Sequence, residues 1–194
     1  MKNNLLLTIT ELCCKGICLL IILGFTVLTM MLIYWHFNPE AYKDYIFIAA
    51  FRAYGPDTIL GYSVTETWTI CDTPRDDPFA WANIKRFSLY FIYLQSTALM
   101  WCFLLVFKEA TNVITSVKSK QSFRIENYRS FRNIGKYFFC IFCLSGFCFI
   151  ASEFGNFYGV YVQLTPLILM MGAYIMAEIF KEGNVLQEEV QSTV

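Results

Sequence analysis

The sequence predicts an all-α membrane protein: one transmembrane domain over residues 1–194, with four spanning helices and cytoplasmic N and C termini. Three observations predict this class. The chain is 57% hydrophobic and only 15% charged, which is too apolar for an ordinary soluble domain. The apolar residues gather into four runs separated by polar segments. The one long basic segment lies between the second and third runs, and membrane insertion keeps such segments in the cytoplasm.

The first run, residues 16–37, contains no charged residue. At about 1.5 Å per residue it covers the ~30 Å hydrocarbon core of a bilayer. A cleaved signal peptide is the competing interpretation, because Lys2 and Lys15 precede the run. The apolar part is longer than a usual signal core and ends in Tyr34, Trp35 and His36 rather than in a small-residue cleavage site, so a signal anchor is favoured.

Residues 38–85 are predicted to be a long extracytoplasmic loop, because acidic residues outnumber basic ones there. Within this loop, residues 41–55 are expected to form a short amphipathic helix in the membrane interface. Residues 61–70 have the composition of a strand. Together they suggest a small extracytoplasmic cap.

The second run, residues 87–107, is uncharged and leads into the basic segment, residues 108–136, with seven basic and two acidic residues. This segment is predicted to be a cytoplasmic loop. From Phe123 onward its apolar residues share one helical face, so an amphipathic helix capped by Ser122 is expected to enter the third span.

The third and fourth runs, residues 137–154 and 158–180, are predicted to be spans joined by a glycine-rich turn at residues 155–159. Pro166 is expected to kink the fourth span. Glu178 lies near its inner end, where a charge marks the interface at little cost.

Four spans forming a four-helix bundle place both termini, including the tail at residues 181–194, on the side of the basic segment. The long acidic loop is then outside. Lipid headgroups explain the basic segment more simply than nucleic acid does.

No constellation of residues in the sequence is typical of an enzyme, a metal site or a cofactor site. With one histidine the chain lacks the usual general base, and it has no Gly-rich phosphate loop or zinc cluster. Cys140 and Cys143 form a C-x-x-C pair, as in four-span thiol oxidoreductases, but at the cytoplasmic end of a span. Asp72, Asp76 and Asp77 do not have the spacing of an EF-hand, so a solvated turn is favoured. The sequence therefore predicts a protein that is not an enzyme.

Two cytoplasmic segments carry a family resemblance. The first has an aromatic, amide and basic pattern at Phe123, Asn127, Phe131, Arg132, Ile134 and Gly135. The second has an acidic and apolar pattern at Ala177, Glu178, Ile179, Phe180, Gly183, Leu186, Glu189, Thr193 and Val194. On these residues the chain resembles the bacterial inner-membrane family called domain of unknown function 2975. Lys120, Ser122 and Ser192 depart from the Gly, Pro and Leu that are usual there.

The resemblance implies a bacterial inner-membrane protein, and members of the family often accompany a small helix-turn-helix regulator. It implies a non-enzymatic regulatory protein that binds or modulates this cytoplasmic partner through the two segments. The residues expected to bind the partner are Phe123, Asn127, Phe131, Arg132, Gly135, Glu178, Gly183, Leu186 and Glu189. The segments would form a docking surface, a mutual clasp, or merely helix caps. A small transporter, channel or immunity-type membrane protein is the alternative.

Overall fold

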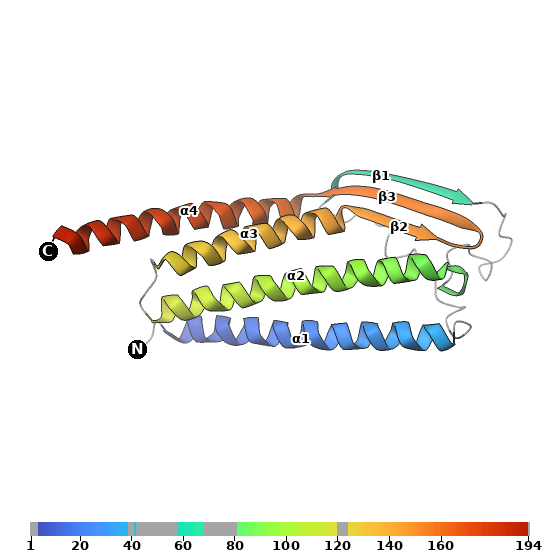
Figure 1. Cartoon of the computed structure of the whole chain (residues 1–194), viewed down its shortest axis with the longest axis horizontal. Coiled ribbons are helices and arrows are strands. Elements are labelled where there is room, and N and C mark those ends of the chain that lie inside the picture. Colours follow the sequence, from blue (N-terminus) through green and yellow to red (C-terminus); the bar gives the residue numbers. More distant parts are fainter. Residues whose placement is uncertain (1–3, 39–40, 42–57, 68–80, 120–123, 194) are drawn as a thin grey trace. The chain divides into compact units, whose positions relative to one another are not determined.

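The computed structural model describes residues 4–38, 41, 58–67, 81–119 and 124–193. This part of the chain contains four long helices and a three-stranded sheet (Figure 1). Three of the helices are long and apolar enough to cross a membrane, over Leu5–Phe37, Arg86–Lys118 and Leu164–Val190. The prediction of a multi-pass, mainly helical membrane protein is consistent with these helices, whereas the sheet adds an element that an all-α class lacks.

The first two predicted spans lie inside longer helices. Helix α1 is Asn4–Phe37 and helix α2 is Arg86–Lys118. Both uncharged runs contain no proline, so nothing interrupts their helical hydrogen bonding. Since α2 continues to Lys118, the expected cytoplasmic loop at residues 108–136 is wrong in its first third, which is helical.

Helix α3 is Ile125–Ser145, which confirms an amphipathic helix over the end of the basic segment. Asn127, Ser130 and Ile134 are buried on one face of it. The connection between α2 and α3 is therefore short. Phe123 and Ser122 lie outside the described residues.

The third span was predicted as one helix over residues 137–154, and this is wrong. Helix α3 ends at Ser145 and strand β2, Phe147–Ala151, follows. Gly146 stands at the junction, where an added Cβ would come within 3.2 Å of the Tyr161 carbonyl oxygen. The Tyr161 N–H donates to the Gly146 carbonyl over 2.7 Å, so pairing with the next strand replaces helical hydrogen bonding here.

The predicted turn at residues 155–159 and the start of the fourth span at residue 158 are also wrong. Residues Gly155–Gln163 form strand β3, in which buried and exposed side chains alternate from Gly155 to Val160. Helix α4 is Leu164–Thr193, so it includes most of the expected tail. Pro166 lies in its first turn, where an N–H would have no helical partner, so no kink is needed.

Strand β1, Thr58–Thr67, completes the sheet in the order β1-β3-β2 with both pairs antiparallel. It confirms the strand predicted from composition, as far as Thr67. Gly155 pairs with Thr67, and a Cβ there would collide with the Glu66 carbonyl oxygen, which explains a residue without a side chain. The predicted interfacial helix beyond Ala41 and the acidic cluster near Pro74 lie outside the described residues.

The chain divides into two compact units. Unit 2 comprises residues 24–99 and 142–164, so it holds the sheet, the end of α1 and the start of α2. Its core contains Trp35, Ile84, Leu89, Cys148, Ile150 and Phe157. Buried Ser88 accepts the Ala151 N–H over 3.0 Å, and Gln95 donates its side-chain amide to the carbonyls of Leu144 and Phe147. These bonds attach α2 to the junction between α3 and β2.

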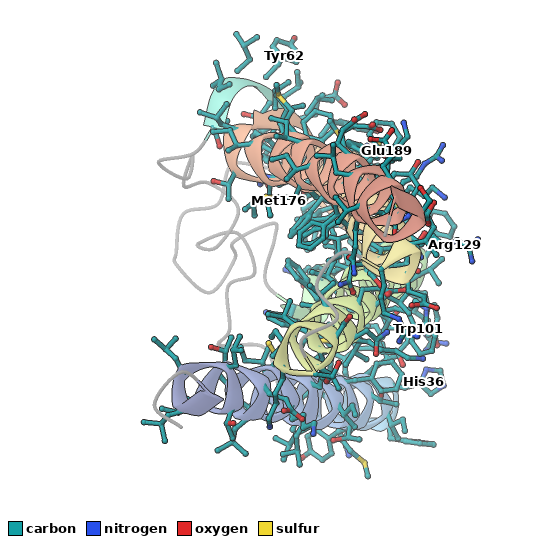
Figure 2. All side chains as sticks on the ribbon, turned by 90° about the vertical axis from the view of Figure 1, so that its left-hand side faces the viewer. His36, Tyr62, Trp101, Arg129, Met176 and Glu189 are labelled. Atoms are coloured by element: carbon teal, nitrogen blue, oxygen red, sulfur yellow. The ribbon has the colours of Figure 1, made fainter. Side chains whose placement is uncertain are left out.

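Unit 1 comprises residues 1–23, 100–141 and 165–194. Its four helical segments lie in a row in chain order, α1, α2, α3 and α4, in both views (Figures 1 and 2). Neighbours in the row contact each other: Glu11 of α1 pairs with Lys118 of α2, Glu109 of α2 accepts from Ser130 of α3, and Phe131 of α3 stacks on Phe180 of α4. Within unit 1 the helices therefore lie in a row, whereas a four-helix bundle was expected from the sequence.

Candidate functional site

The described parts of the two segments that carry the family resemblance, residues 125–135 and 177–193, both fall in unit 1, on α3 and α4. Polar side chains attach α3 to α2. The Ser130 hydroxyl donates to the Glu109 carboxylate over 2.7 Å, and the Asn133 amide donates to its other oxygen over 3.3 Å. Asn112 donates to the same carboxylate over 3.4 Å. Glu109 is thus held by three donors, and hydrogen bonds to a charged acceptor are stronger than neutral ones.

Asn127 makes a second polar contact between the same two helices. Its side chain is 2% exposed and donates to the Ser116 hydroxyl over 3.0 Å. Burial of an amide is tolerated only when it is hydrogen-bonded. Asn127 therefore joins α3 to α2, and its side chain is closed to a partner protein.

Aromatic rings and small residues attach α3 to α4. The rings of Phe131 and Phe180 stack with centroids 5.0 Å apart and an interplanar angle of 25°. Gly135 lies under Tyr174, where an added Cβ would be 2.9 Å from the ring. Ala173 and Ala177 are buried, so small side chains line this side of α4. Close packing of this kind is how helices associate within a membrane.

The two signature segments therefore clasp each other through the stacked rings of Phe131 and Phe180. Arg124 pairs with Glu126 of its own segment over 3.2 Å, and Arg132 donates to Tyr128 over 3.2 Å. On α4, Glu178 pairs with Lys181 over 3.1 Å. Such exposed local pairs contribute little to stability.

Several of the predicted partner-binding residues are exposed and face away from the clasp. Arg132 and Glu178 are exposed, and Leu186 is exposed to 61%. In the view of Figure 2, Arg129 of α3 and Glu189 of α4 extend to the same side. Gly183 is half-buried inside the helical tail. The exposed residues form an accessible surface on unit 1, whereas Asn127, Phe131 and Gly135 support it from inside.

The sequence pattern singled out Asn127, Phe131 and Gly135 of α3. It did not single out Glu109 and Ser116 of α2 or Tyr174 of α4. A usable signal exists for the first two: Glu109 and Ser116 are seven residues apart, which puts them on one face of a helix. Their partners on α3, Asn127, Ser130 and Asn133, follow one another at intervals of three residues and so form a stripe along that helix. Two matching polar stripes predict an interhelical contact.

The described cysteines and acidic side chains do not gather into a metal site. Cys140 and Cys143 are exposed free thiols on α3, and no group of three metal-ligating side chains occurs among the described residues.

Compared with known proteins, the chain matches no family model, no curated protein and no solved structure.

Proposed function

We propose that this protein is a non-enzymatic regulatory protein of the bacterial inner membrane, and that the end of α4 docks a cytoplasmic helix-turn-helix regulator. The resemblance described above supports the nature of the partner. The observation that carries the proposal is an exposed apolar pair on the tail helix: Leu186 is 61% exposed and Val190 is 65% exposed.

The position of this pair along α4 is what makes it informative. Helix α4 has 30 residues, which is about 45 Å, whereas the hydrocarbon core needs about 20 residues. Charged residues recur from Glu178 onward, so the last turns extend into water. Lipid does not cover Leu186 and Val190 there, and they lie four residues apart on one face. An apolar helix stripe in water is the pattern of a helix that docks in a groove.

Carboxylates flank the apolar pair and suit a cationic partner. Glu182 lies four residues before Leu186, and Glu189 lies one residue before Val190. DNA-binding proteins carry basic surfaces that contact phosphates. The regulator would dock on this acidic helix through a basic surface, and it also needs a basic surface to bind DNA. Docking would therefore oppose DNA binding.

The first test removes the apolar pair and keeps the helix. The double variant Leu186→Ser, Val190→Ser should insert and accumulate normally, because both side chains are exposed. It should lose most of its capture of the regulator, as loss of two docking side chains costs about 2 to 4 kcal/mol. Capture is measured by pull-down of the regulator encoded nearby, together with a transcriptional reporter.

Val185→Ser is the matched control, since Val185 is on the same tail but on another face of the helix and is 45% exposed. It should behave like wild type. Deleting residues 183–194 should have the effect of the double variant. If the double variant and the deletion both bind the regulator normally, the regulatory proposal fails, and flux of ions or solutes in liposomes becomes the measurement to make.

A further inference from the structure

A second site lies in unit 1, between α1 and α2. An open cavity of about 450 Å³ is lined by two lysines, by apolar side chains and by two small polar side chains. Its walls include Lys15, Cys18, Trp101, Leu104, Lys108 and Asn112. The tail of α4 contributes nothing to it.

The two lysines fix the depth of the cavity in the membrane. Lys15 immediately precedes the uncharged run at residues 16–37, and Lys108 immediately follows the one at residues 87–107. Each is the first charge at the cytoplasmic end of a span. Both ammonium groups therefore lie at the level of the inner-leaflet headgroups.

The positive charge of the cavity is only partly compensated by the protein. Lys15 pairs with Glu11 over 2.6 Å, but Glu11 also pairs with Lys118 over 3.3 Å, so one carboxylate serves two cations. Lys108 forms no ion pair within the described part of the chain. The neighbouring Glu109 does not neutralise it, because Ser130 and Asn133 hold that carboxylate against α3.

The apolar part of the cavity wall is suited to the acyl chains of a lipid. Trp101 is 64% exposed, and Figure 2 shows it projecting from α2 to the outside of the row of helices. Cys18 lies three residues after Lys15, and Trp101 lies seven residues before Lys108, so on their helices they are about 5 and 10 Å deeper in the bilayer than those lysines, with Leu104 between Trp101 and Lys108. Asn112 and Thr111 add polar side chains on the charged side.

We infer that this cavity binds an anionic phospholipid of the inner leaflet, with the phosphate between Lys15 and Lys108 and an acyl chain along Leu104 and Trp101. Basic pockets between spanning helices on the cytoplasmic side select anionic headgroups. Inorganic phosphate would satisfy the lysines alone and leave the apolar wall unused.

The test compares lipids on the full-length protein in nanodiscs or micelles, by native mass spectrometry. Phosphatidylglycerol should bind more tightly than phosphatidylcholine. Lys108→Gln should weaken phosphatidylglycerol about fivefold, corresponding to one lysine at the membrane surface, and leave phosphatidylcholine unchanged. Lys108→Arg should retain the wild-type preference, since the positive charge is kept.

Lys136→Gln is the matched control, because Lys136 is an exposed lysine directly before the third apolar run and does not line the cavity. It should not change the preference. The inference is overturned if both lipids bind equally, if the Lys136 and Lys108 variants lose the preference to the same extent, or if inorganic phosphate displaces phosphatidylglycerol at millimolar concentration.

Discussion

Gly135 and Gly172 lie on neighbouring helices but have opposite surroundings. A Cβ at Gly135 would meet the ring of Tyr174 at 2.9 Å, whereas a Cβ at Gly172 would meet nothing within 4 Å. The first glycine is required by the contact between α3 and α4, and the second is not. Substituting each of the two glycines therefore separates the effect of glycine on helix stability from its effect on packing between helices.

Gly135→Leu should lower the free energy of unfolding by about 1 to 3 kcal/mol, because the new side chain must displace Tyr174. Gly172→Leu should be neutral or stabilising by up to about 1 kcal/mol, since glycine disfavours a helix. Gly135→Ala should fall between the two, as the gain in helix propensity offsets a small shift of the exposed Tyr174 ring. Unfolding in mixed micelles measures all three. Equal effects of the two leucine variants would contradict the proposed clasp.

At the scale of elements, the end of α3 depends on a side chain from another helix. The last carbonyls of a helix lack helical partners. Gln95 of α2 donates to the Leu144 carbonyl in that last turn and to the Phe147 carbonyl in β2. A polar residue inside an uncharged span thus has a structural role.

Gln95→Leu should lower the free energy of unfolding by about 1 to 3 kcal/mol, because two carbonyl acceptors lose their donor in an apolar setting. Thr97→Val is the control: Thr97 is two residues away and donates only to Leu94 of its own helix. It should change stability by less than about 1 kcal/mol. If the two variants are equally stable, Gln95 does not fix the junction.

Hydropathy predicted helices α1 and α2 but not strands β2 and β3, for a physical reason. The uncharged runs of α1 and α2 are long enough to specify helices without further information. Residues 147–151 and 157–163 are also uncharged and mainly apolar or aromatic, but a short run of this kind fits a buried strand as well as a helix. Pairing with β1, which is distant in sequence, decides the outcome, and no local pattern contains that contact.

The candidate site was predictable to a similar degree. The family-like pattern identified both segments that meet, because the residues within each segment are close together in the sequence. It did not separate Phe131, which stacks inside the clasp, from Arg132, which is exposed. A single residue step around a helix decides which side chain is buried, and the position of the neighbouring helix sets that choice.

At the scale of the whole molecule, the number of crossings determines the side on which α4 ends. Three helices are long and apolar enough to span, which alone would put the termini on opposite sides. The part of α3 after Lys136 is too short to be a span, because residues 137–145 extend only about 13 Å. Strand β2 adds five residues, or about 16 Å, and the sum reaches the ~30 Å of the hydrocarbon core.

We propose that the end of α3 and strand β2 together form one further crossing, which would make the number of crossings even and place both termini in the cytoplasm. Backbone groups of a strand at membrane depth need partners, and β2 has them: β3 pairs with it, and Ser88 of α2 accepts the Ala151 N–H. A reporter fused after Val194 should therefore behave as cytoplasmic, like one fused before Met1. A reporter inserted at Asp77 should behave as exported. A C-terminal fusion active only outside would show that α3 and β2 do not cross, and it would place the acidic end of α4 beyond the reach of any cytoplasmic regulator.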